Sequence, residues 1–292
     1  MIPEAYAVYL TTEKKMAENT SQAYLRDIRH FSNFAAARGI TDLQEVSSTD
    51  ILAYLMELKT GGRSKSTVNR KLASIRTFYQ YLVKKGVLKD NPTEAIKSPK
   101  VEKKDIQYLS TEEIERLLEL PDDTVKGKRD RAILELLYAT GIRASELIEM
   151  QTEDVNIRMG FIKCAGTHGT ARIIPIGRPC RNAMEAYAAQ ARELLRREQE
   201  TEVLFLNYAG KPFTRQGLWK VLKEYGEQAQ LAVPLTPQVI RNSFAVHMLQ
   251  NGADIKSLQE LMGHEDISAT QAYLAVVKNR IKDVYDRTHP RA

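Results

Sequence analysis

Four side chains that lie far apart in the sequence have the chemistry to attack a phosphodiester bond without a metal ion. They are Arg143, Arg241, His264 and Tyr273. A tyrosine hydroxyl can serve as a covalent nucleophile, and paired guanidinium groups fit the oxygens of a phosphate and of its transition state. Each residue also has an ordinary alternative. Arg143 could pair with Glu146 on a helix face, and His264 could cap a helix. Tyr273 could be a half-buried aromatic. The order of the four residues and their local contexts favour the chemical interpretation.

Predicted helix boundaries place these side chains. Arg143 follows a glycine turn at a helix start, where its guanidinium and free backbone N–H groups could face one anion. Arg241 lies in a helix that starts at a Thr-Pro pair. A short helix ends at a glycine directly before His264, and Ser268 is expected to cap the helix that carries Tyr273. The four residues are therefore expected at turns and helix starts, where side chains can converge.

The first third of the chain predicts a bundle of helices. Apolar residues recur at helical spacing in three stretches, with expected caps at Asn19-Thr20, at Ser48 or Thr49, and at Ser64 or Ser66. Residues 98–108 are charged, contain a proline and lack periodicity, which indicates a linker. We therefore predict a helical domain over 1–98, a linker over 99–108 and a second domain over 109–292.

The second domain is predicted to be mostly helical with one small sheet. Ser110 and Glu113 have the spacing of a capping box at the start of its first helix. Residues 155–176 alternate short apolar runs with glycines and a proline, which favours an antiparallel hairpin sheet. The fold class is accordingly mainly α, in two domains, with a small antiparallel β-sheet in the second.

Composition indicates a folded, mildly basic protein. The 292 residues carry a net charge of +6 with a pI of about 9.1, which is compatible with a polyanionic partner. Residues 1–98 hold 15 Lys and Arg against 10 Asp and Glu, a surplus of 5, so most of the excess lies there. Two cysteines form no disulfide framework, and neither a secretory signal nor an apolar run of membrane-spanning length is visible. We expect a cytoplasmic protein.

A basic stretch at the start of the third predicted helix is a candidate DNA-binding surface. Hydroxyl and amide side chains interleave with its basic residues, a mixture that suits phosphates and groove edges. A solvated charged face is the alternative. The basic residues are Arg63, Lys65, Arg70, Lys71 and Arg76.

No metal site is expected. Cys164, Cys180 and His247 lack the spacing of zinc ligands.

Three stretches of the sequence resemble the tyrosine recombinases, closest to the Xer type and to phage and integron integrases. The first is Asn19-Thr20-Ser21-Gln22-Ala23-Tyr24-Leu25-Arg26-Asp27. The second is Ala139-Thr140-Gly141-Ile142-Arg143-Ala144-Ser145-Glu146-Leu147. The third runs from Asn251-Gly252-Ala253-Asp254 through Leu261-Met262-Gly263-His264 to Tyr273. The resemblance covers essentially the whole chain and implies a helical, SAM-like core-binding domain followed by the catalytic domain.

The resemblance also implies a site-specific recombination mechanism. Tyr273 would attack a DNA phosphate to form a 3′-phosphotyrosyl link and release a 5′-hydroxyl. Arg143 and Arg241 would hold the non-bridging oxygens, and His264 would hydrogen-bond the same phosphate. No metal, ATP or other cofactor is implied. The expected partners are a double-stranded DNA recombination site and further recombinase subunits, which would form a tetramer with or without a second recombinase.

Two positions depart from the family pattern, and both would move protons. The family has a lysine in the hairpin turn, where this chain has Thr167 or His168, depending on the turn length. Threonine is no acid near neutral pH, whereas His168 could serve. Lys163, in the preceding strand, would have to reach in from there. The family has histidine or lysine where this chain has Gln238, which cannot take a proton.

Since general acid and base catalysis are each worth about 10²–10⁴-fold, these departures motivate an alternative function. The chain could be a catalytically impaired DNA-binding partner of an active recombinase. A helix–turn–helix regulator is a third and weaker possibility.

Overall fold

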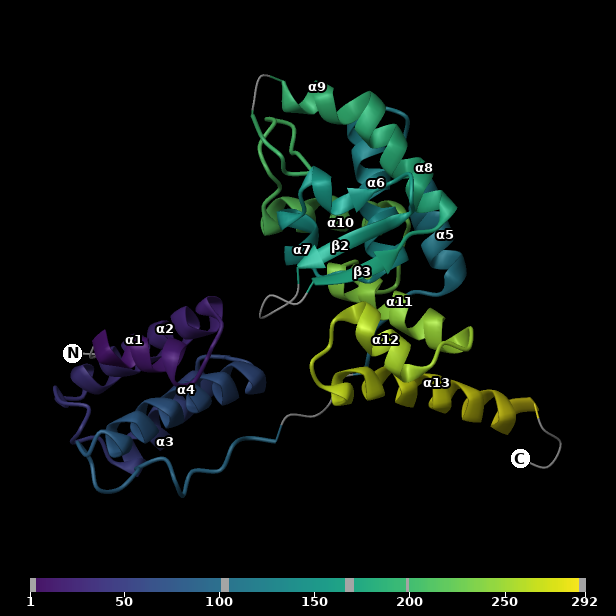
Figure 1. Ribbon diagram of the computed structural model, residues 1–292. Coiled ribbons are helices and arrows are strands. Elements are labelled where there is room, and N and C mark those ends of the chain that lie inside the picture. The colour runs from purple at the N-terminus through teal and green to yellow at the C-terminus, as the bar shows by residue number, and fades with distance from the viewer. Residues whose placement is uncertain (1–3, 101–104, 166–170, 198–199, 289–292) are drawn as a thin grey trace. The chain divides into compact units, whose positions relative to one another are not determined.

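The computed structural model describes residues 4–100, 105–165, 171–197 and 200–288, with side chains up to residue 278. The chain divides into two compact units, Met1–Lys104 and Asp105–Ala292 (Figure 1).

Four helices lie in the described part of the first unit. They are α1 (Glu4–Thr12), α2 (Glu18–Ala37), α3 (Ser48–Thr60) and α4 (Lys65–Lys84). One apolar face of each helix contributes to a shared core, which includes Tyr6, Ile28, Phe31, Ile51 and Leu72. Complete burial of side chains of this size stabilises the fold by about 1.5–3 kcal/mol each. The bundle predicted from the periodicity is confirmed.

The second unit is helical around a small sheet. Its α-helices are α5 (Thr111–Glu119), α6 (Val125–Thr140), α7 (Ala144–Glu149), α8 (Arg178–Tyr187), α9 (Glu193–Arg196), α10 (Arg215–Gln228), α11 (Pro237–Gln250), α12 (Ile255–Met262) and α13 (Ile267–Thr288). The strands β1 (Val155–Asn156), β2 (Phe161–Ala165) and β3 (Ala171–Pro175) pair antiparallel in the order β1-β2-β3. In the register Ile162 faces Ile174 and Cys164 faces Arg172. The predicted fold class, mainly α with a small antiparallel sheet, is confirmed.

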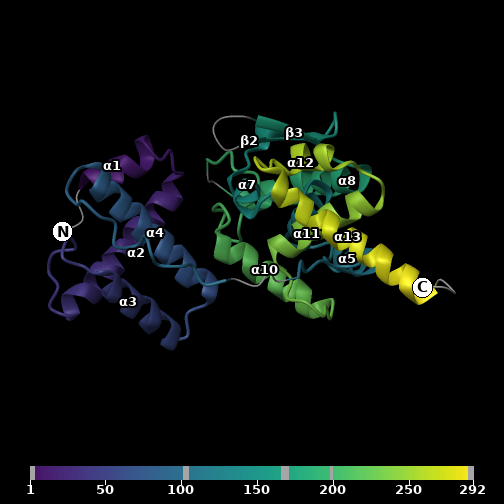
Figure 2. The ribbon, with the colours of Figure 1, turned by 90° about the horizontal axis from the view of Figure 1, so that it is seen from below.

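Helix α11 is the central element for the site. Eleven of its residues are buried, from Pro237 to Leu249. It packs against α6, α12 and α13, and α13 lies beside α11 and α12 in both ribbon views (Figures 1 and 2). Helix α12 in turn contacts β3. A single buried helix therefore connects the elements that carry the four candidate side chains.

Several helix starts differ from the sequence prediction by a few residues. The hydroxyl of Ser47 caps α3, because Ser47 and Asp50 form a complete capping box. Helix α2 begins at Glu18, before the predicted Asn19-Thr20 cap. The carboxylate of Asp266 accepts the backbone N–H of Ser268, so Asp266 takes the role predicted for Ser268. The predicted boxes and caps at Ser110–Glu113 and Ser64 are confirmed.

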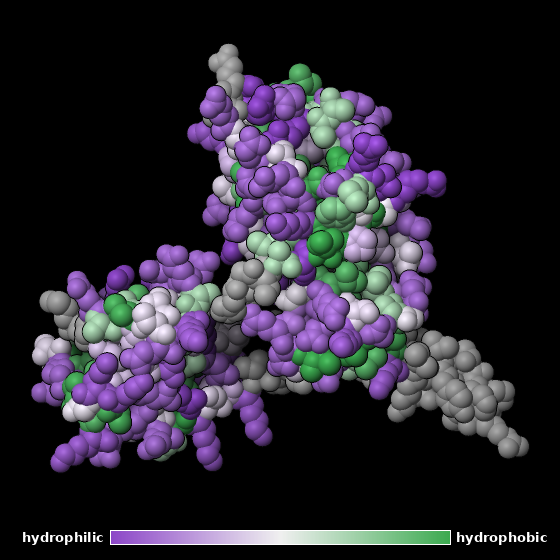
Figure 3. Space-filling view, in the orientation of Figure 1, coloured by the Kyte–Doolittle hydropathy of each residue, from purple (hydrophilic) through white to green (hydrophobic). Residues whose placement is uncertain are grey.

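The face shown in Figure 3 is mostly hydrophilic, with apolar side chains in small patches. Both cysteines are buried as free thiols. Among the described residues, no helix is long and apolar enough to cross a membrane.

Candidate active site

Arg143 lies in the turn between α6 and α7. Gly141 ends α6 in the left-handed region with φ 59°, and Arg143 occupies the N-cap of α7. A side chain at Gly141 would meet the ring of Phe244 at 2.3 Å, so glycine is required for space as well as for φ. The Arg143 guanidinium donates to the carbonyl of Gly263 at 2.9 Å, while its side chain stays 41 % exposed. It is anchored but still open to solvent.

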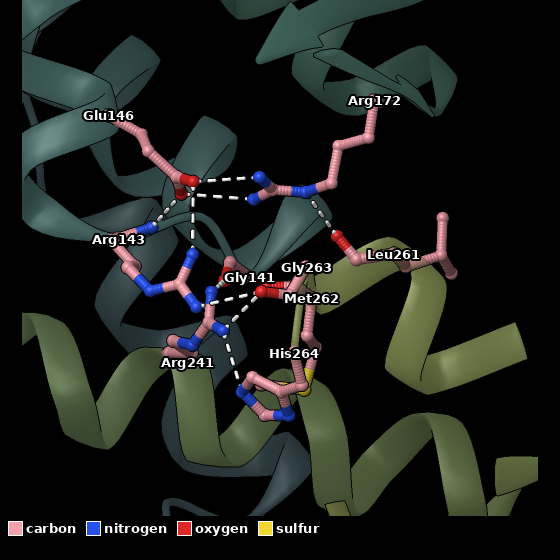
Figure 4. A network of polar contacts seen from close by, with 9 residues as sticks. All are labelled: Gly141, Arg143, Glu146, Arg172, Arg241, Leu261, Met262, Gly263 and His264. Carbon is pink, nitrogen blue, oxygen red and sulfur yellow. Dashed lines mark hydrogen bonds and ion pairs between the residues drawn. The ribbon is translucent and has the colours of Figure 1, made fainter. Parts of the chain in front are cut away.

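Arg241 approaches the same place from α11 and is only 4 % exposed. Its guanidinium donates to the carbonyls of Gly141 and Met262, the latter at 2.8 Å, and to Nε2 of His264 at 2.9 Å (Figure 4). Burial, and then the positive charge of Arg143, lower the pKa of Arg241 to about 10. The guanidinium is therefore still protonated at neutral pH, and an incoming anion would relieve the repulsion between the two arginines.

His264 follows Gly263, which ends α12 with φ 61°. Burial and the charges of Arg241, Arg143 and Arg172 lower the pKa of His264 to about 4. The ring is therefore neutral near pH 7. Since Nε2 accepts from Arg241, Nδ1 carries the proton and donates to Oγ1 of Thr270 at 2.8 Å. Thr270 lies in α13, so the ring connects the arginine cluster to the helix of Tyr273.

A carboxylate and a third arginine hold this cluster in place. Neither residue was predicted from the sequence to be functional. Glu146 accepts from the backbone N–H of Arg143 at 2.6 Å and from both Nη atoms of Arg172, at 2.7 and 3.0 Å (Figure 4). Arg172 also donates from Nε to the carbonyl of Leu261 at 2.8 Å. Burial alone would raise the pKa of the Glu146 carboxyl, but the hydrogen bonds from Arg172 and Arg143 hold that pKa below its ordinary value. The signals were present: Glu146 lies three residues after Arg143, and Arg172 is the last residue of the predicted hairpin turn.

The guanidinium groups of Arg143 and Arg241 thus converge on the segment 262–264, which includes His264. Beside them lies a hollow of about 560 Å³, lined by Arg143, Glu146, Ala165, Gly263 and His264 among others. The guanidinium of Arg143, which is 41 % exposed at the edge of this hollow, can bind a phosphate. Of the sequence-predicted residues, the structure brings these three together.

Tyr273 is carried by α13 and is 5 % exposed. Its hydroxyl donates to Oδ1 of Asn242 at 2.9 Å, and the same oxygen accepts from Nε2 of Gln238 at 2.8 Å. Burial raises the pKa of the Tyr273 hydroxyl, although the positive charge of Arg241 and a hydrogen bond with Gln238 act in the other direction. Asn242 was not singled out from the sequence, although it directly follows Arg241. The predicted nucleophile and Gln238 therefore lie on one side of α11, joined by this amide.

The hairpin turn at residues 166–170, which contains Thr167 and His168, lies outside the described residues. Lys163 is exposed on β2. It lies two positions before Ala165 and therefore on the same face of the strand. Ala165 lines the hollow, so this face of β2 leads toward it.

The five basic residues predicted to bind DNA have different surroundings. Arg63 and Lys65 are exposed at the start of α4. Arg70 and Lys71 both pair with Asp27, and Lys71 is only 8 % exposed. Arg76 donates to Oγ of Ser98 at 2.8 Å and to the carbonyl of Ile96. Lys71 is buried and Arg76 is partly buried against Ser98 and Ile96, whereas Arg63, Lys65 and Arg70 are exposed, Arg70 while paired with Asp27.

Among the described residues, no cluster of three or more His, Cys, Asp or Glu side chains could hold a metal ion.

Comparison with known sequences gives matches over nearly the whole chain. Residues 107–280 match the Phage integrase family, and residues 4–86 match the phage integrase N-terminal SAM-like domain. The chain is 42 % identical to Tyrosine recombinase XerD of Staphylococcus haemolyticus, over 100 % of this chain and 99 % of that protein. It is 39 % identical to Tyrosine recombinase XerD of Oceanobacillus iheyensis, over 99 % and 98 % of the two chains.

Solved structures show the same fold. The Tn1549 transposon integrase in complex with transposon right end DNA has a TM-score of 0.75 at 19 % identity, over 97 % of this chain and 98 % of that one. The XerH site-specific recombinase bound to palindromic difH substrate, a post-cleavage complex, has a TM-score of 0.73 at 18 % identity, over 96 % and 93 % of the two chains.

Proposed function

The chain belongs to the phage integrase family of tyrosine recombinases, and we propose that Tyr273 is its nucleophile and that Arg143, Arg241 and His264 bind the scissile phosphate. The protein is a site-specific DNA recombinase, an enzyme that transfers DNA strands. The observation that carries the assignment of residues is the convergence of Arg143, Arg241 and His264 on residues 262–264, with the helix of Tyr273 tied to His264 through Thr270.

Each cleavage step exchanges one ester for another. Oη of Tyr273 bonds to phosphorus as the bond from phosphorus to the 5′-oxygen breaks, and the 3′ end of the strand becomes a phosphotyrosyl ester. The phenolic proton must leave, and the 5′-oxygen must gain a proton to depart as a hydroxyl. The ester keeps the energy of the broken bond, so attack by another 5′-hydroxyl rejoins the strand without ATP.

The two guanidinium groups supply the positive charge for the transition state. Charge accumulates on the non-bridging oxygens as phosphorus becomes pentacoordinate, and donors that are already fixed in place stabilise it without reorganisation. Arg241 is fixed by two carbonyls, and Arg143 by Glu146 and Gly263. His264 is neutral and adds no charge, because its pKa is about 4. Its ring holds Arg241 through Nε2 and Thr270 through Nδ1, so a hydrogen bond from His264 to the phosphate would have to replace the one to Thr270.

The site is poorly equipped for proton transfer. Gln238 and Asn242, the side chains at the Tyr273 hydroxyl, are both amides and cannot take its proton. The leaving 5′-oxygen would receive its proton from His168 or, less directly, from Lys163. We therefore expect a slow chemical step in an otherwise intact site. The alternative of a non-catalytic DNA-binding partner is not favoured by the comparisons or by any contact among the described residues.

We propose that the substrate is double-stranded DNA held by both units, and that the working assembly is a tetramer on two sites. The DNA complexes of structurally similar recombinases support DNA binding and a multimeric assembly. Arg63, Lys65 and Arg70 would contact phosphates at the start of α4. A second recombinase could replace half of the subunits. We propose that this activity takes place in the cytoplasm, where the DNA substrate is present.

A trapping assay tests the proposed nucleophile. The cognate site is first identified by selecting genomic fragments that the protein binds. A version of that site with a nick just 3′ of the scissile phosphate is then cleaved. The short fragment that carries the new 5′-hydroxyl diffuses away, so the strand cannot be rejoined and the phosphotyrosyl ester is trapped. We expect an SDS-resistant protein–DNA adduct from the native protein and none from Tyr273→Phe. Tight specific binding without any adduct would refute the assignment.

A further inference from the structure

The carboxamide of Asn242 is shared by three groups from separate parts of the second unit. Its Nδ2 donates to the backbone carbonyl of Gln107 at 2.8 Å, and its Oδ1 accepts from Gln238 at 2.8 Å and from the Tyr273 hydroxyl at 2.9 Å. Gln107 lies in the segment without helix or strand that precedes α5. One buried amide therefore ties the segment leading out of the linker to the nucleophile.

The direction of these hydrogen bonds is fixed by chemistry. A backbone carbonyl can only accept, so the atom of Asn242 that faces Gln107 must be the NH₂ group. The other end is then a carbonyl oxygen, which can only accept as well. The Tyr273 hydroxyl must therefore point its proton at Asn242. The opposite rotamer would place two acceptors against each other at Gln107 and two donors against each other at Gln238.

We propose that Asn242 is the positioning residue for the nucleophile, holding the Tyr273 hydroxyl protonated and in place against the segment at Gln107. The inference rests on the proposed role of Tyr273 and adds what controls that hydroxyl. Asn242 is 8 % exposed and Tyr273 is 5 % exposed, so water competes little for this hydrogen bond.

This arrangement determines where the phenolic proton can go. When Oη bonds to phosphorus, the proton shared with Asn242 must leave, and a neutral carboxamide is far too weak a base to accept it. Hydroxide from solvent must remove it, either before attack or during attack. The fraction of tyrosinate rises about tenfold for each pH unit below the tyrosine pKa, so the rate of cleavage should rise with pH in the same proportion.

The other described groups around Tyr273 do not supply the base that Asn242 fails to provide. Arg241 on α11 is positively charged and favours tyrosinate without accepting a proton. His264 faces Arg241 and Thr270 through its two ring nitrogens. Tyr108 and Tyr138 pack on the same apolar cluster, where the hydroxyl of Tyr138 contacts His247, and α12 contributes Leu258 and Met262 to it.

Single-turnover cleavage of the nicked site, followed from pH 6 to 9.5, tests the inference. Asn242→Asp keeps the shape and the acceptor that faces Tyr273 and Gln238, loses the donor to the Gln107 carbonyl, and supplies a carboxylate base. We expect the native rate to rise about tenfold per pH unit, and the rate of Asn242→Asp to level off above about pH 7, where it should be at least about tenfold faster than native. Asn242→Ala should cleave at least about tenfold more slowly, with the native pH slope and unchanged DNA affinity.

Gln250→Glu is the matched control, because it makes the same amide-to-carboxylate change at the exposed end of α11. It should keep the native rate and slope. The inference is overturned if Asn242→Asp keeps the native pH slope, or if both Asn242 variants cleave like the native protein. If Asn242→Ala fails to fold, the slope of Asn242→Asp decides alone. An absence of adduct in the native protein would instead refute the role of Tyr273, and with it this inference.

Discussion

The guanidinium of Arg241 donates a hydrogen bond to Nε2 of His264 across 2.9 Å. This contact sets the tautomer of the imidazole, since the remaining proton must lie on Nδ1, where it reaches Thr270. Thr270 precedes Tyr273 by three residues on α13 and therefore lies on nearly the same helix face. The arginine cluster and the helix that carries Tyr273 are thus coupled through one neutral ring.

The low pKa of His264 predicts a pH dependence of stability. An unfolded histidine has a pKa of about 6.5, whereas the native value is about 4. Between these values the unfolded state binds a proton that the native state does not bind. The contribution of His264 is therefore complete above pH 6.5 and is lost as the pH falls toward 4. After screening of this half-exposed ring, we expect a loss of about 1–2 kcal/mol. The free energy of unfolding is measured by denaturant titration at pH 7.5 and at pH 4.5. It should decrease less between these two pH values in His264→Gln than in the native protein, and equal decreases would contradict the low pKa of His264.

Glu146 is expected to be the most important acidic residue of the site for stability. It neutralises Arg172 and Arg143, and its side chain is only 11 % exposed. Removing one partner of a buried ion pair leaves the other charge uncompensated, so Glu146→Gln should lower the free energy of unfolding by about 3 kcal/mol. Urea titration measures this change. The exposed pair Lys223–Glu227 is the control, and Glu227→Gln should have no measurable effect. Similar losses in both variants would show that Glu146 has no special role.

The sequence was most informative where local rules decide the structure. The helix starts at Ser64 and Ser110 and the helix end at Gly141 can be recognised from neighbouring residues, and all three were predicted, Ser64 as one of two alternatives. Contacts between distant segments could not be derived in this way. The pairing of Glu146 with Arg172 depends on where β3 lies, and the contact of Asn242 with Gln107 spans 135 residues. Sequence motifs therefore indicated the candidate reacting groups, whereas the groups that hold them became visible only in three dimensions.

Gly141 is predicted to tolerate no side chain. Its φ of 59° is unfavourable for other residues, and a Cβ would lie 2.3 Å from Phe244. Gly252 also has a positive φ, 91°, but nothing lies within 4 Å of its Cβ position. The difference between Gly141→Ala and Gly252→Ala therefore isolates the clash. We expect losses of about 3 and about 1 kcal/mol in the free energy of unfolding. Gly141→Ala should also reduce adduct formation, because the carbonyl of Gly141 holds Arg241. Equal losses would argue against the close packing with Phe244.

Gln238→His should accelerate cleavage. The Gln238 side chain reaches Asn242 beside the Tyr273 hydroxyl, so an imidazole at this position can accept the phenolic proton. We expect adduct formation at pH 7.5 to increase by at least about tenfold, toward the range of about 10²–10⁴ that general base catalysis can supply. Gln238→Leu removes the hydrogen bond without adding a base and should be no faster than the native protein. If Gln238→His is also no faster, then proton removal does not limit cleavage.

The leaving group gives a separate test of the missing hairpin lysine. His168 or Thr167 stands where the family has that lysine, so protonation of the 5′-oxygen should be inefficient. Replacing that oxygen with sulfur produces a thiolate, which departs without needing an acid because thiols are much stronger acids than alcohols. His168→Lys should therefore speed cleavage of the ordinary site by at least about tenfold and leave cleavage of the 5′-thio site unchanged. Gel analysis of adducts from both substrates measures the two rates. Equal acceleration on both substrates would mean that the lysine acts on the phosphate charge, and no acceleration on either would show that proton donation is not the weak step.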